Sequence, residues 1–167
     1  MAQPNLIITT DIDCCLTAPN RDFDYWPPVM PGAQSGIRLL KLLLDAEFVA
    51  ITSRPPQQSD ITRAWLDENF PNLIPTVIHS ELYRHRYWPY LPLASYKGLV
   101  ARDLGASVHI DDTPLHIAAA LDYQVELPVL FGLYRWNVDA KLPAPAVHAP
   151  RWPEVCYEIF GRFRHQF

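Results

Sequence analysis

Residues 6–13 of the chain read LIITTDID, a short apolar and β-branched run followed at once by an acidic cluster. Such a run is typical of a buried strand, and the carboxylates of Asp11 and Asp13 would then stand just beyond its carboxyl end. Further along the chain, apolar runs of similar length alternate with segments of helical periodicity. This alternation predicts a parallel sheet with helices on both faces.

The pattern predicts five strands and five helices. Strands are expected at 6–10, 48–51, 76–78, 108–110 and 129–133, and helices at 33–47, 59–70, 96–104, 114–122 and 153–163. Gly105 follows the third helix, where glycine takes the left-handed conformation that commonly ends a helix. We therefore expect an α/β fold, specifically a three-layer α/β/α sandwich around a Rossmann-like parallel sheet of about five strands, in one domain spanning residues 1–167.

The composition fits a globular domain and narrows the class of partner. Of the 167 residues, 49% are hydrophobic and 19% are charged, which is ample material for a core. The net charge of −4 argues against avid binding to the phosphate backbone of nucleic acids. The chain shows neither signal-peptide features nor about 18 consecutive apolar residues, so we expect a cytoplasmic protein without a membrane segment. The three cysteines have no CxxC spacing and predict neither a disulfide framework nor a structural zinc site.

Polar side chains follow three of the predicted strands. They are Asp11 and Asp13 after the first strand, Thr52, Ser53 and Arg54 after the second, and Asp111 and Asp112 after the fourth. Because the carboxyl ends of parallel strands meet at one edge of a sheet, these side chains should gather there.

Four carboxylates at one edge need positive charge among them. Two like charges about 4 Å apart repel by about 4 kcal/mol at an effective dielectric of about 20. Mg²⁺ is the natural counter-ion, since it prefers oxygen ligands and shares carboxylates with substrate phosphate. Lys97, near the start of a predicted helix, would add a second cation. One negative charge would still remain, which a protonated carboxyl, then available as a general acid, would remove.

In order and spacing, these segments resemble the four motifs of the haloacid dehalogenase (HAD) superfamily. LIITTDIDCCLT resembles the first motif, VAITSRP the second, Lys97 the third and VHIDD the fourth. More weakly, VLFGLYRWN followed by RWPEV is similar to the tail of the 5′(3′)-deoxyribonucleotidase branch. The chain departs from the family at Cys14, where glycine is frequent, and at Cys15, where threonine or valine is usual.

The resemblance implies a Mg²⁺-dependent phosphomonoester hydrolase that acts through an aspartyl-phosphate. Asp11 would be the nucleophile, and Asp13 would protonate the leaving oxygen and then activate water. Thr52 would bind a phosphoryl oxygen, and Lys97 would screen the charge between nucleophile and phosphate. Aspartate rather than tyrosine at position 13 favours phosphatase over dehalogenase chemistry.

The resemblance also implies the metal ligands. Mg²⁺ would be held by Asp11, by the backbone carbonyl of Asp13, and by Asp111 together with Asp112.

Two neighbours of Thr52 are candidates for substrate binding. Ser53 is the alternative to Thr52 for the phosphate contact. Arg54 either reaches a phosphate or carboxylate of the substrate or is an ordinary loop arginine paired with Asp60.

Two short loops, near residues 18–32 and 80–95, are left to select the substrate, because neither interval has room for a large cap domain. The second loop interleaves basic residues with aromatics, which either stack a base or cover the sheet edge or a partner in a homodimer. We expect a small phosphorylated substrate, with a nucleotide first and a sugar phosphate close behind.

Three other functions remain open at this stage. The chain could be a catalytically inactive HAD-like binding or assembly module, or a polynucleotide 3′-phosphatase, which its net charge disfavours. A receiver-like phosphoacceptor also clusters Asp, Thr and Lys around Mg²⁺, but its acidic pair ends the first strand, whereas the pair in this chain comes last.

Overall fold

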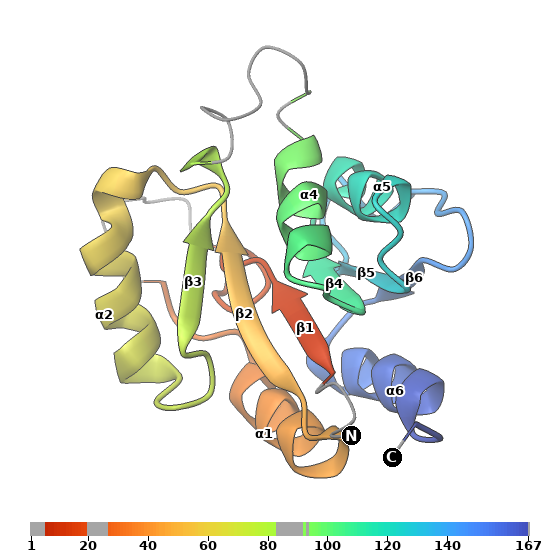
Figure 1. Cartoon of the computed structure of the whole chain (residues 1–167), viewed down its shortest axis with the longest axis horizontal. Coiled ribbons are helices and arrows are strands. Elements are labelled where there is room, and N and C mark those ends of the chain that lie inside the picture. The colour runs from red at the N-terminus through yellow and green to blue at the C-terminus, as the bar shows by residue number, and fades with distance from the viewer. Residues whose placement is uncertain (1–5, 20–26, 83–91, 93, 167) are drawn as a thin grey trace.

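The structure is a computed structural model that describes residues 6–19, 27–82, 92 and 94–166 (Figure 1). Strands and helices alternate along these residues, which confirms the expected α/β class. The strands are β1 (Ile7–Thr10), β2 (Glu47–Thr52), β3 (Thr76–His79), β4 (Val108–Asp111), β5 (Leu127–Phe131) and β6 (Val147–Ala149). The helices are α1 (Ala33–Leu44), α2 (Ser59–Asn69), α4 (Ser95–Asp103), α5 (Pro114–Asp122) and α6 (Trp152–Phe163), with a 3₁₀ turn, η1, at Pro56–Gln58.

All six strands are parallel, and their order in the sheet is β3-β2-β1-β4-β5-β6. The chain runs outward from β1 to β3, then returns to the other side of β1 and continues outward from β4. This Rossmann-like order changes direction between β1 and β4, and in open α/β sheets ligands commonly bind beyond the strand ends at such a point. The topology therefore brings the acidic segments after β1 and at the end of β4 together.

Helices cover both faces of the sheet, so the three-layer sandwich is confirmed. On one face, α1 packs against α6, and residues of α1, α2 and α6 share the larger core with Phe48 and Ile110 of the sheet. On the other face, α4 and α5 lie side by side (Figure 1) and enclose a smaller core with Ile51 of β2.

The close approach of α4 and α5 depends on Gly98. A Cβ at this position would lie 2.7 Å from the backbone carbonyl of Ala119 in α5. Glycine therefore lets the two backbones pack directly against each other, which fixes the first turn of α4 and, with it, Lys97.

The sheet has six strands rather than about five, and the bounds of α1 and β5 differ from those expected by more than one residue. Strand β6 has only three residues in a proline-rich stretch, too few for a periodic pattern. Helix α1 ends at Leu44 rather than residue 47, because Asp45 takes a left-handed conformation and Glu47 already pairs with Ile7 of β1. Strand β5 lies two residues earlier than expected, because Gly132 turns the chain with φ 80°. Gly105 ends α4 with φ 68°, as expected.

Most of the two loops assigned to substrate selection falls outside the described residues. The flanks of the first loop are described and pair with each other through an antiparallel bridge between Thr17 and Val29. In the described ranges, no helix has both the length and the apolar character needed to cross a membrane.

Candidate active site

The candidate site is centred on Lys97, a buried lysine in the first turn of α4. Its ammonium lies 2.5 Å from Oδ2 of Asp11, which follows β1, and 2.8 Å from Oδ2 of Asp111, the last residue of β4. Burial alone would lower the pKa of Lys97, but the two carboxylates outweigh it and raise the pKa above its ordinary value. Lys97 is therefore positively charged, and as the residue of the third motif it links Asp11 of the first motif to Asp111 of the fourth.

Asp111 is fully buried, and donors within the protein surround its carboxylate. Oδ2 accepts from Lys97, while Oδ1 accepts from the backbone N–H of Thr113 at 2.9 Å and from Nδ1 of His116 at 3.0 Å. Burial would raise the pKa of Asp111, but Lys97 and the nearby imidazoles lower it well below its ordinary value. Asp111 is thus an ionised residue whose oxygens are already largely occupied.

Two histidines, His109 and His116, adjoin Asp111. His109 is buried in β4 with Nδ1 2.9 Å from the Thr9 hydroxyl, while its Nε2 lies 3.6 Å from Asp111 Oδ2 without a hydrogen bond. Burial lowers the pKa of His109, so its imidazole is neutral and forms no ion pair there. His116 instead contacts Asp111 directly from α5. The contact is possible because Asp111 ends β4 and His116 lies in the first turn of the helix that follows.

Asp11, Asp111 and Asp112 each offer a carboxylate oxygen, and these oxygens lie within 4.8 Å of one another. With Lys97 as the ammonium among them, two negative charges remain uncompensated. Burial raises the pKa of Asp11 to about 7, and burial with the charge of Asp111 raises the pKa of Asp112 to about 6. A buried all-oxygen cluster short of two positive charges fits a hard divalent cation such as Mg²⁺.

Asp13 faces a different partner. Its carboxylate is held by both ends of the Arg54 guanidinium, with Nε 2.9 Å from Oδ2 and Nη2 2.6 Å from Oδ1. Arg54 therefore pairs with Asp13 and not with Asp60, the loop partner considered above. The carboxylate of Asp13 is half-exposed and is not one of the three clustered groups.

The pair between Arg54 and Asp13 changes the charge balance. Four carboxylates, Lys97 and Arg54 leave two negative charges, which one divalent cation would neutralise completely. Without substrate, charge balance therefore requires no protonated carboxyl, whereas a bound phosphate dianion would add two negative charges and again favour protonation of one carboxyl.

Thr52 and Ser53 have different environments. Thr52 is fully buried at the end of β2, where its hydroxyl accepts from the backbone N–H of Arg54 at 3.1 Å and its carbonyl accepts from the N–H and the hydroxyl of Ser80. Ser53 is exposed. The backbone of the second motif is therefore anchored at Thr52.

Cys14 lies between the acidic residues and has a left-handed backbone with φ 60°, a conformation uncommon for residues other than glycine. Burial and the charges of the surrounding aspartates raise the pKa of its thiol to about 12. The thiol is therefore protonated at neutral pH, as expected of a packing residue and not of a nucleophile.

Sequence reasoning missed the segment after β5. Tyr134 donates its hydroxyl to the Cys14 carbonyl at 2.7 Å, and Trp136 donates its indole N–H to Asp112 Oδ2 at 2.9 Å. Asn137 Nδ2 donates to the backbone carbonyls of Asp112 and Phe131. The signal that the sequence offers is the string LYRWN, which is weakly similar to the tail of one HAD branch. That similarity does not predict contact with the site.

The fold and the site together define an α/β protein with a Rossmann-like sheet and a buried carboxylate–lysine cluster at its switch point. No protein-family model matches the chain, and no curated protein matches it. The resemblance to the HAD motifs therefore remains a prediction from the sequence alone.

Proposed function

We propose that this protein is a Mg²⁺-dependent phosphomonoester hydrolase that forms an aspartyl-phosphate on Asp11. The observation that carries the proposal is the joint contact of Lys97 with Asp11 and Asp111 at the switch point of the sheet. A lysine that bridges two carboxylates can also screen an incoming phosphate from the nucleophile. The four motifs of the resemblance supply the same residues in the same order.

In the first half of the proposed reaction, a carboxylate oxygen of Asp11 attacks phosphorus. The bond from phosphorus to the leaving oxygen breaks, and Asp13 donates a proton to that oxygen. In the second half, Asp13 takes a proton from water as the water attacks phosphorus. The acyl-phosphate bond breaks, which releases phosphate and restores the Asp11 carboxylate.

Asp11, Asp112 and the backbone carbonyl of Asp13 are the proposed metal ligands, because the oxygens of Asp111 are largely taken by Lys97, Thr113 and His116. When bound, Mg²⁺ would neutralise charge on the phosphoryl group and keep Asp11 ionised. Without added positive charge, the pKa of Asp11 near 7 leaves this group partly protonated at neutral pH, and a protonated carboxyl is a poor nucleophile.

The proposed substrates are small phosphomonoesters in the cytoplasm, with nucleotides first. The similarity of the tail to the deoxyribonucleotidase branch favours nucleotides, and the net charge of −4 disfavours long nucleic acids.

Turnover of p-nitrophenyl phosphate with Mg²⁺ tests the proposed function. We expect saturable hydrolysis that falls about 100-fold or more when a chelator removes the metal, because metal stabilisation of transition-state charge contributes several kcal/mol. Readdition of Mg²⁺ should restore the rate, and a panel of nucleotides and sugar phosphates should then rank the substrates. Absence of turnover on the whole panel would reject the proposal and favour an inactive binding module.

Arg54 offers a second prediction, because we propose that the guanidinium that holds Asp13 also binds the phosphate dianion of the substrate. Substitution Arg54→Met should raise KM for a phosphomonoester about 10-fold or more, since a charge-assisted hydrogen bond contributes about 1.5–3 kcal/mol. Steady-state kinetics would separate KM from kcat. Arg63→Met is the matched control, because Arg63 pairs with Asp67 within α2 and should leave both constants unchanged. A fall in kcat at constant KM would show that Arg54 acts only through Asp13.

A further inference from the structure

The segment that follows β5 packs against two loops of the candidate site at once. Gly132 turns the chain with φ 80°, and a Cβ there would overlap the ring of Tyr134. Tyr134 in turn stacks on Trp136, with ring centroids 4.8 Å apart and an interplanar angle of 14°. Its hydroxyl donates to Cys14, so the stack is tied to the loop after β1. Trp136 is therefore held in place from one side although about half of it is exposed.

The held indole is directed at Asp112. Nε1 of Trp136 lies 2.9 Å from Oδ2 and 3.2 Å from the backbone carbonyl of Asp112. Asn137 donates to the same carbonyl at 2.9 Å. The hydroxyl of Thr113, at 3.4 Å from Oδ1, is a long contact. Of these two side-chain donors, the indole N–H thus makes the shorter hydrogen bond to the Asp112 carboxylate.

Asp112 differs in this respect from its neighbour in the sequence. The ammonium of Lys97, a backbone N–H and an imidazole already surround Asp111. In Asp112, by contrast, Oδ2 accepts from the indole and Oδ1 has only a long contact, 3.4 Å, with a side-chain donor among the described residues, the Thr113 hydroxyl. A carboxylate that is oriented on one oxygen and open on the other is suited to bind a cation without first losing rotamer freedom.

We propose that Trp136 is a positioning residue that raises the affinity of the site for a divalent cation by orienting Asp112. The inference rests on the proposed metal site. It predicts that loss of the indole N–H weakens metal binding about 10-fold or more, the range found when partners of metal ligands are removed. Because Trp136 acts through Asp112, turnover at saturating metal should stay close to that of the original protein.

Substitution Trp136→Phe removes the N–H and keeps an aromatic ring to stack on Tyr134. Isothermal titration calorimetry with Mg²⁺, and with Mn²⁺ as a second probe, would give the dissociation constants without any turnover. We expect both constants to rise about 10-fold or more. Tyr157→Phe, on the exposed surface of α6, is the control and should leave them unchanged.

The outcomes separate the two proposals. If the original protein binds the metal and Trp136→Phe binds it with equal affinity, the positioning role alone is overturned. No metal binding by the original protein would overturn the metal site, and the inference with it. A lower kcat at saturating metal with unchanged affinity would also overturn the inference, because it would indicate contact with the substrate.

A second measurement tests the inference without a substitution, for the case in which Trp136→Phe does not fold. Titration of the unsubstituted protein with Mg²⁺ should change its tryptophan emission with the midpoint found by calorimetry, because Trp136 is bonded to a proposed ligand. Unchanged emission at metal saturation would contradict the inference.

Discussion

Asp11→Asn should reduce phosphomonoester turnover by about 10⁴-fold or more, the scale of loss seen when a covalent nucleophile is removed. The amide keeps the size and planar shape of the carboxylate but cannot attack phosphorus. It also removes one of the negative charges that balance the proposed cation. Turnover of p-nitrophenyl phosphate with saturating Mg²⁺ would measure the effect.

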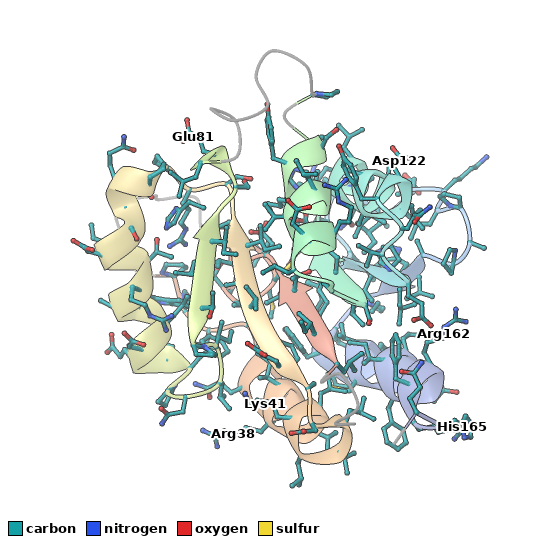
Figure 2. The ribbon with its side chains drawn as sticks, viewed as in Figure 1. Arg38, Lys41, Glu81, Asp122, Arg162 and His165 are labelled. Carbon is teal, nitrogen blue, oxygen red and sulfur yellow. The ribbon has the colours of Figure 1, made fainter. Side chains whose placement is uncertain are left out.

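The protein should stay folded in this variant, because Lys97 retains its ion pair with Asp111. Circular dichroism and thermal unfolding would confirm it. Asp122→Asn is the matched control, since Asp122 is exposed at the end of α5 (Figure 2) and should leave turnover unchanged. Full activity of Asp11→Asn would reject the aspartyl-phosphate mechanism whatever the metal requirement.

Lys97→Met should produce the largest loss of stability, about 3–5 kcal/mol in the free energy of unfolding. Methionine fills nearly the same volume, so the loss would come from charge and not from a cavity. Asp11 and Asp111 would face each other in a buried site without the ammonium that now lies within 2.8 Å of both. Urea denaturation at neutral pH would give the difference in free energy.

Lys41→Met is the control for this variant. Lys41 is a half-buried lysine on α1 (Figure 2), and its ammonium has a long contact of 3.5 Å with the carbonyl of Leu73. We expect a change within about 0.5 kcal/mol, as for most substitutions outside buried networks. A loss of that same small size in Lys97→Met would show that the buried carboxylates need no permanent cation. Mg²⁺ should restore part of the stability of Lys97→Met, since a ligand that binds only the folded state stabilises it.

The α/β class and the elements that carry the candidate residues could be predicted from the sequence, because the signals are local. A buried strand is a short apolar run, and a following polar residue such as Asp11 or Thr52 marks its end whatever the rest of the chain does. Gly105 likewise ends α4 through its own backbone freedom. The parallel arrangement then follows from the alternation of strands and helices, which places Asp111 at the same sheet edge as Asp11.

The partners of these side chains were decided by the tertiary structure alone. Arg54 binds Asp13 across 41 positions of sequence, and Trp136 binds Asp112 across 24. Neither pairing follows from any periodicity, since each depends on the path of a loop and on the side-chain rotamers that the packed core permits. Strand β6 was missed for a related reason, because three residues become a strand only when β5 is already in place beside them.

The sequence by itself determined the order of strands and helices and the chemistry at their ends, because both depend on residues within a few positions of one another. The tertiary structure decided which hydrogen-bond donors reach each carboxylate. Asp111 and Asp112 are adjacent and chemically identical in sequence, yet one is enclosed by Lys97 and His116 and the other is oriented by a single indole. That difference comes from packing between distant segments, since burial and hydrogen-bond donors reach each carboxylate from different elements of the fold.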